Sequence, residues 1–171
     1  IDFMASDSLG REWQVATIQL DVNLPQRFDL TYISPEGRDE NVVMIHAAIM
    51  GSIERYMSIL IEHYAGNFPV WLAPVQVKLL SVSESHGEYC HSLAAEMKGK
   101  GIRVEVDTAN DTVGNKIRKS TQEKVPYLLV IGDKEMNSEK LFVRERGERE
   151  AKEWDREEFI ESVIRMSKER K

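Results

Sequence analysis

Apolar and polar side chains recur along the first third of the chain in patterns that predict two strands and a helix. Residues 11–21, REWQVATIQLD, alternate between polar and apolar side chains, as a strand does. A short apolar run at 42–45 predicts a second strand. From 49 to 64, apolar side chains recur at helical spacing, which predicts an amphipathic helix with a buried stripe. Gly66 stands where a helix C-cap is expected.

The rest of the chain alternates strand and helix patterns. Apolar runs predict strands at 75–82, 102–106, 127–131 and 140–143. Helical spacing predicts helices at 85–98, at 113–124 and from about Asp155, a candidate N-cap, to 166. Strands separated by helices form largely parallel sheets that are covered by those helices. The pattern therefore predicts an α/β fold.

Charge divides the chain into two parts. Residues 1–70 carry four basic and ten acidic side chains with no lysine, whereas residues 71–171 carry nineteen of each sign. The change falls in 67–74, a segment with two prolines that cannot continue a helix. We therefore predict one domain at 1–70 and a second at 71–171.

Composition limits the class of protein. The chain has a formal net charge of −6, which argues against indiscriminate nucleic-acid binding but leaves room for a local contact in the second half. No apolar run reaches transmembrane length, so no membrane partner is expected. The single cysteine, Cys90, excludes an internal disulfide and suits a cytoplasmic location.

Two side chains in the first part are candidates for ligand binding. Arg55 flanks the predicted core helix just after a Gly-Ser step, and a guanidinium is costly to bury without an anionic partner, so it could hold a phosphate. The alternative is an ion pair with a carboxylate at the rim of the core. His46 stands where the predicted strand meets the helix, and a single imidazole there is either a core histidine or one ligand of a larger metal site.

Neutral hydrogen-bonding side chains follow the first predicted strand. A regular strand would place Thr17 and Gln19 on one face and Gln14 on the other. Amides and hydroxyls can read a nucleotide or an amino acid without adding charge. They can equally be exposed sheet residues.

Polar residues also gather in the second half. Asn110 precedes a predicted helix that bears Lys116 and Arg118. Asn110 or its neighbour could cap that helix while the basic residues face solvent. The segment 132–135, GDKE, and Arg144 are expected beyond the C-terminal edge of the strand at 127–131, where α/β sheets bind ligands.

The order of these motifs resembles a known family. REWQVATIQLDVNLPQRFDLTY, then VMIHAAIMGSIERYMSILIEHYAGNFPVWLAPVQV, then DTANDTVGNKIRKSTQEKVPYLLVIGDKE are similar to the C-terminal part of bacterial-type threonyl-tRNA synthetases. The resemblance spans residues 1 to about 147. It implies the antiparallel end of a class II catalytic domain followed by an α/β anticodon-binding domain with a mixed, largely parallel sheet.

The resemblance implies roles for the candidates of the first part. MGSIER is similar to motif 3, so Arg55 would hold ATP, which is bound with Mg²⁺. Gln14 and Thr17 match adenosine and ribose contacts, and Gln19 matches a residue of the threonine pocket. His46 matches one of three ligands of a Zn²⁺ ion that binds the amino group and hydroxyl of threonine, and such a metal rejects valine.

The second part resembles the anticodon-binding domain of the same family. The residues that match base-reading positions carry amide, guanidinium, ammonium or carboxylate groups: Asn110, Arg118, Lys134, Glu135 and Arg144. Such groups can read unstacked bases on their Watson–Crick edges. The implied partners are threonine tRNA, ATP and threonine, and the family also implies a homodimer.

This chain departs from the family pattern in several places. Ala47 and Ala109 stand where the family usually has Arg, and Ala16 where it has Gly. Motif 1, most of motif 2, the other two zinc ligands and the editing domains have no counterpart here. We therefore expect a portion of a threonine–tRNA ligase that does not aminoacylate tRNA by itself, and the opening inside a strand favours that interpretation. The alternative is a stand-alone, non-catalytic paralogue that binds tRNA or regulates translation.

Overall fold

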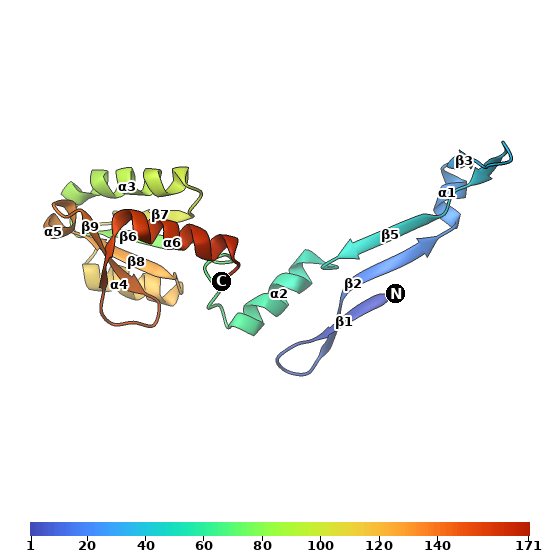
Figure 1. Cartoon of the computed structure of the whole chain (residues 1–171). Coiled ribbons are helices and arrows are strands. Elements are labelled where there is room, and N and C mark those ends of the chain that lie inside the picture. Colours follow the sequence, from blue (N-terminus) through green and yellow to red (C-terminus); the bar gives the residue numbers. More distant parts are fainter. The chain divides into compact units, whose positions relative to one another are not determined.

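The computed structural model describes all residues from 1 to 171 and has a mixed α/β fold, as the sequence predicts (Figure 1). The chain forms two compact units, Ile1–Gly66 and Asn67–Lys171, called unit 1 and unit 2 below. No helix is both long enough and apolar enough to cross a membrane.

Unit 2 is built on a five-stranded sheet of order β10-β9-β8-β6-β7. Its strands are β6 (Val77–Ser81), β7 (Val104–Asp107), β8 (Tyr127–Ile131), β9 (Lys140–Glu145) and β10 (Lys152–Asp155). The pairs β6–β7 and β6–β8 are parallel, whereas β8–β9 and β9–β10 are antiparallel. The second half of the sheet reverses because only a four-residue helix and short loops separate β8 from β9, too few residues for a parallel crossover. The charged strand β10 is not predicted by the hydrophobic pattern.

Helices cover both faces of this sheet (Figure 1). They are a short 3₁₀ turn η1 (Glu84–His86), α3 (Gly87–Gly99), α4 (Val113–Gln122), α5 (Asp133–Met136) and α6 (Arg156–Lys168). α3 and α6 supply the apolar residues that pack on one face in the main core, together with Val77, Leu79 and Leu129. α4 supplies none of that core and packs against β6 and β8. Asp155 caps α6 as predicted, but Thr112 caps α4 rather than Asn110 or Asp111.

Unit 1 contains a three-stranded antiparallel sheet of order β1-β2-β5 and a separate hairpin. The elements are β1 (Asp2–Ser6), β2 (Glu12–Asp21), α1 (Asn23–Arg27), β3 (Thr31–Ile33), β4 (Asp39–Asn41), β5 (Met44–Ile49) and α2 (Ile53–Tyr64). β5, which corresponds to the strand predicted at 42–45, is longer than predicted and begins two residues later. Met50 and Gly51 turn the chain with positive φ, and the side chain of Ser52 then caps α2.

The apolar stripe of α2 is not buried, so the expectation of a buried stripe is wrong. No residue of α2 is buried, and Ile53, Met57 and Ile61 are exposed. All the large apolar side chains that are exposed belong to unit 1, except Val82 and Met136. Periodicity shows which face of a helix is apolar. The sheet β1-β2-β5 of unit 1 and α2 itself provide no further layer that covers the apolar face of α2.

Candidate functional sites

A β-bulge in β2 brings the polar side chains of unit 1 onto one face of the sheet. Phe3 pairs with Ala16 and Met4 pairs with Gln14, so β2 has one extra residue at this step. Because the bulge shifts the alternation by one residue, Gln14 points to the same face as Thr17. Gln14 Nε2 accordingly donates to Oδ1 of Asp2, the residue paired with Thr17, at 2.6 Å. The expectation that Gln14 lies on the opposite face is therefore wrong.

This face continues across to β5. Gln19 pairs directly with His46, and Thr17 pairs with Ala48, so Gln14, Thr17, Gln19 and His46 share it. Thr17 Oγ1 is buried and has no hydrogen-bond partner within the chain. A buried hydroxyl without a partner is costly, so this atom is suited to a hydrogen bond with a bound ligand.

Arg55 faces an aromatic ring rather than a carboxylate. Its Cζ lies 5.7 Å from the centroid of the Trp13 ring, in cation–π geometry. It forms no ion pair, so the alternative of a rim carboxylate partner is wrong. Glu54, the adjacent acid, accepts a hydrogen bond from Ser52 Oγ at 2.7 Å instead. The ring contact leaves the guanidinium fork available for an anion.

The indole N–H of Trp13 is held by a charged group. Trp13 Nε1 donates to Asp7 Oδ2 at 2.8 Å, and Arg11 Nε donates to the same oxygen at 2.5 Å. Desolvation acts to raise the pKa of Asp7, but these bonds and two backbone N–H bonds hold that pKa well below its usual range. The ionised carboxylate therefore anchors the ring against which Arg55 lies.

His46 pairs with a carboxylate, and the chain alone does not complete a zinc site. His46 Nε2 lies 3.0 Å from Asp21 Oδ2, while Asp21 Oδ1 accepts backbone bonds from Asn23 and Leu24. These backbone bonds, that of Leu24 first, lower the pKa of Asp21. No group of three or more His, Cys, Asp or Glu side chains is placed to hold a metal. Tetrahedral zinc needs three or four protein ligands, so the residues of this chain do not fit zinc by themselves.

In unit 2, the C-terminal ends of β6 and β7 frame a hollow of about 400 Å³ that contains Asn110. Its lining residues are Val82, Ser83, Glu84, Thr108, Ala109, Asn110 and Asp111. Ser83 and Glu84 were missed by the sequence reasoning, although they directly follow a predicted strand at the edge where α/β sheets bind ligands. Lys119 Nζ lies 2.8 Å from Asp111 Oδ2 and, as the largest cause, lowers the pKa of that carboxyl.

Lys134 and Glu135 follow the end of β8, at the same edge of the sheet. Glu135 Oε2 accepts a hydrogen bond from Gly132 N at 2.9 Å, which fixes one carboxylate oxygen. The buried His86 connects this segment to the hollow, because its Nδ1 accepts from Ser83 N at 3.1 Å and its Nε2 lies 3.1 Å from Asp133 Oδ1. Asn110, Lys134 and Glu135 therefore belong to one edge of the sheet, a place that the sequence predicts for the segment 132–135.

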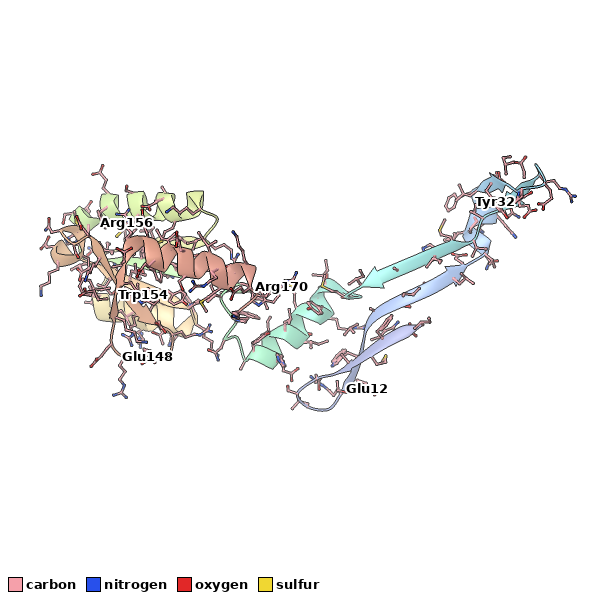
Figure 2. All side chains as sticks on the ribbon, in the orientation of Figure 1. Glu12, Tyr32, Glu148, Trp154, Arg156 and Arg170 are labelled. Carbon is pink, nitrogen blue, oxygen red and sulfur yellow. The ribbon has the colours of Figure 1, made fainter.

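Arg144 does not lie at that edge, contrary to expectation. β9 runs antiparallel to β8, and Arg144 pairs with Leu128 near the start of β8. Its Nε donates to the carbonyl oxygen of Glu148 at 2.9 Å, in the loop after β9 (Figure 2). A second hollow, of about 130 Å³, is lined there by Arg144, Leu128 and Thr121 of α4. Arg118, exposed on α4, stands one helical turn before Thr121.

Lys116 is also not where the sequence suggests. The sequence leaves open that it faces solvent, but the side chain is fully buried under the ends of β6 and β7. The apolar spacing of α4 gives no sign of this, because a lysine in an amphipathic pattern reads as a surface residue.

Two family models match the chain. One, described as "Anticodon binding domain", matches residues 72–166. The other, described as "tRNA synthetase class II core domain (G, H, P, S and T)", matches residues 1–64.

Curated relatives carry the name threonine–tRNA ligase. That of Carboxydothermus hydrogenoformans is 48% identical over 171 residues, which are 100% of this chain and 27% of the relative. That of Acetivibrio thermocellus is 49% identical over 168 residues, which are 98% of this chain and 26% of the relative. The chain thus spans about a quarter of the length of these relatives.

A solved structure shares the fold. The RNA-binding domain of threonyl-tRNA synthetase from Cryptosporidium parvum Iowa II superposes with a TM-score of 0.82 at 37% sequence identity. The match covers 96% of this chain and 42% of that chain.

Proposed function

The chain belongs to the threonyl-tRNA synthetase family of class II aminoacyl-tRNA synthetases, and from this premise we propose that it reads the anticodon of threonine tRNA and supplies part of the site for ATP and threonine. In the enzyme that we propose, the threonine carboxylate attacks the α-phosphate of ATP to form threonyl-adenylate and releases pyrophosphate. A hydroxyl of the terminal ribose of the tRNA then takes the threonyl group and releases AMP. The observation that carries the RNA-reading role is the place of Asn110, in a hollow at the C-terminal edge of the parallel strands, the same edge at which Lys134 and Glu135 follow β8.

The chemistry of this edge favours bases over phosphates. Glu84, whose carboxylate repels a phosphate, and Asn110, which carries an amide, both line the hollow, and Asp111 there is paired with Lys119. Amide and carboxylate oxygens accept hydrogen bonds from base N–H groups. Val82 adds exposed apolar surface against which a base can pack. Arg118 and Arg144, beside the second hollow, would contact another part of the anticodon loop.

The polar face of unit 1 supports the nucleotide role. Gln14, Thr17 and Gln19 share one face, and the unpartnered hydroxyl of Thr17 is suited to a ribose hydrogen bond. We propose that Gln14 and Thr17 contact the adenosine of ATP, bound with Mg²⁺, and that Gln19 contributes to the threonine pocket. Arg55, held against Trp13 without an ion pair, would contact the phosphates. A fixed guanidinium there offsets the charge that develops as the α-phosphate is attacked.

Zinc, dimerisation and location remain proposals that rest on the family. His46 would supply one zinc ligand, with the remaining ligands outside this chain, so no chemical step is assigned to the metal here. We likewise propose a homodimer and a cytoplasmic location for the enzyme.

Direct RNA binding tests the proposal. The 171-residue chain is titrated with a synthetic threonine anticodon stem-loop and with a stem-loop whose loop bases are scrambled, at one fixed salt concentration because affinity depends on salt. The threonine stem-loop is expected to bind about ten-fold more tightly, and Asn110→Ala to remove most of that difference. The matched control is Gln122→Ala, which removes an exposed amide of α4 away from the hollow. Equal affinity of the unaltered chain for both RNAs would contradict the proposal.

A further inference from the structure

The ammonium group of Lys116 lies in the interior of unit 2. The side chain is 1% exposed and is the largest fully buried side chain of the protein. It extends from α4 toward the sheet. Burying an ammonium group costs several kcal/mol unless hydrogen bonds and an opposite charge compensate for the lost water.

The compensating groups belong to the last residues of two neighbouring strands. Lys116 Nζ donates to Ser81 O at 2.8 Å, and lies 3.3 Å from Ser81 Oγ and 3.3 Å from Asp107 O. Ser81 ends β6 and Asp107 ends β7. The carboxylate of Asp107 lies 4.0 Å away and supplies the opposite charge. An ammonium has three donors, and here all three have oxygen acceptors.

Both strand ends lead into the hollow that contains Asn110. After Ser81 the chain continues into the wall formed by Val82 and Glu84. After Asp107 it continues into the facing wall, where Asp107 Oδ1 accepts a hydrogen bond from Ala109 N at 3.0 Å. Ala109 directly precedes Asn110. The Lys116 ammonium is therefore connected to Asn110 through the Asp107 carboxylate and the backbone N–H of Ala109.

Stability alone does not call for a charge at this position. Apolar side chains of similar volume that replace both members of a buried ion pair are often neutral or stabilising, although the removal of one member alone is destabilising. What such a side chain cannot do is add three hydrogen bonds to Ser81 and Asp107 at the point where the β6–β7 pairing ends. Recognition of a base depends on that kind of preorganisation, since the reading group must already be in place when the base arrives.

We infer that Lys116 is a positioning residue for RNA reading, which fixes the Asn110 segment against the Glu84 segment through Ser81 and Asp107. This inference rests on the proposed function of the same hollow. It adds a residue that makes no contact with the RNA and acts only through Asn110 and its neighbours.

A double-mutant cycle in the 171-residue chain tests the coupling. Affinity for the threonine anticodon stem-loop is measured for Lys116→Met, for Asn110→Ala and for the double variant. Each single substitution is expected to lower affinity about ten-fold, and the double variant to lose little more than either, because residues that act through one another are not additive. A purely structural role would instead give additive losses of about a hundred-fold.

Two controls separate this effect from a general change of the surface. Lys98→Met removes an exposed lysine of α3 and is expected to leave affinity unchanged. Lys116→Met combined with Arg144→Ala is expected to give additive losses, because Arg144 lines a different hollow. Additive losses with Asn110→Ala, or an unchanged affinity of Lys116→Met, would overturn the inference.

A second variant covers the case in which Lys116→Met does not fold, as judged by circular dichroism. Asp107→Ala removes the acceptor of the Ala109 N–H while Lys116 keeps its three other oxygen partners. It is expected to show the same non-additivity with Asn110→Ala, and additive losses there would again overturn the inference. If the unaltered chain does not distinguish the threonine stem-loop from a scrambled one, the proposed function fails; if it does and the cycle is additive, only the positioning role fails.

Discussion

Arg144 is paired directly with Leu128, the second residue of β8, whereas Lys134 and Glu135 follow the other end of that strand. A strand rises about 3.3 Å per residue, so several residues of strand separate the two groups. The base-reading candidates thus form one group at the C-terminal edge and another beside α4 and β9. In the RNA-reading role that we propose, the two groups are therefore expected to contact different nucleotides.

The second group gives the first prediction. Arg118→Ala and Arg144→Ala should each weaken binding of the threonine anticodon stem-loop by about 1–3 kcal/mol, as expected for the loss of a guanidinium contact with a base. The scrambled stem-loop should lose far less, because a base contact carries sequence information and a phosphate contact does not. Filter binding of both RNAs to both variants measures this. An equal loss for the two RNAs would show that these arginines contact only the backbone.

His86 gives the second prediction, which concerns stability. Its buried ring joins Ser83 to Asp133, so His86→Leu removes the acceptor of the Ser83 N–H, while the exposed Asp133 carboxylate loses the ring but keeps water. The free energy of unfolding should fall by about 1–2 kcal/mol, measured by urea unfolding. His91→Leu, which replaces an exposed histidine of the following helix α3, is the matched control and should change it by less than about 0.5 kcal/mol. If the two variants lose similar free energies of unfolding, the hydrogen bonds of the His86 ring contribute no measurable stability, and the prediction is wrong.

Some of these relationships follow from the sequence and some do not. The strand at 127–131 and the polar GDKE segment after it could be read from the hydrophobic pattern, which is why Lys134 and Glu135 were placed correctly. Arg144 was misplaced because pattern analysis does not show that β9 reverses direction. Gln14 was assigned to the wrong face because a bulge adds one residue without a sequence signal in β2.

The hydrophobic pattern also does not show which charged side chains are buried. Lys116 and Arg118 are two residues apart on α4, which places them on opposite faces, and Lys116 is buried whereas Arg118 is exposed. Periodicity separates the two faces, but it treats every lysine as polar and so does not assign one to the interior. The acceptors that make the burial of Lys116 possible are carbonyl oxygens at strand ends, and main-chain acceptors leave no trace in the sequence.

Metal content gives the third prediction. The 171-residue chain should hold well below one zinc ion per chain after dialysis, because His46 is joined only by Asp21 and no third ligand is near. Inductively coupled plasma mass spectrometry measures the metal, and His46→Ala should leave the result unchanged. Tight, stoichiometric zinc in this chain would contradict the assignment of His46 as a single ligand.

Cys90 gives the fourth prediction, on pH. Desolvation raises the pKa of its thiol to about 11, so the folded state favours the neutral form. This contribution to stability is fully present below the pKa of an unfolded thiol, about 8.5, and is lost as pH rises from there toward 11. At pH 8 the native thiol should therefore react with an aromatic disulfide reagent far more slowly than the urea-unfolded chain. Equal rates in the two states would contradict this.

Two methionines on helices of the two units give the last prediction. Met97 of α3 is 0% exposed in the core of unit 2, whereas Met57 of α2 is 53% exposed in unit 1. Met97→Gln places an amide in an apolar core and should lower the free energy of unfolding by about 3 kcal/mol. Met57→Gln should change it by less than about 0.5 kcal/mol, because its side chain already meets water. Urea unfolding followed by circular dichroism compares the two. A large loss for Met57→Gln would mean that the stripe of α2 is covered in solution, as its helical periodicity first suggested.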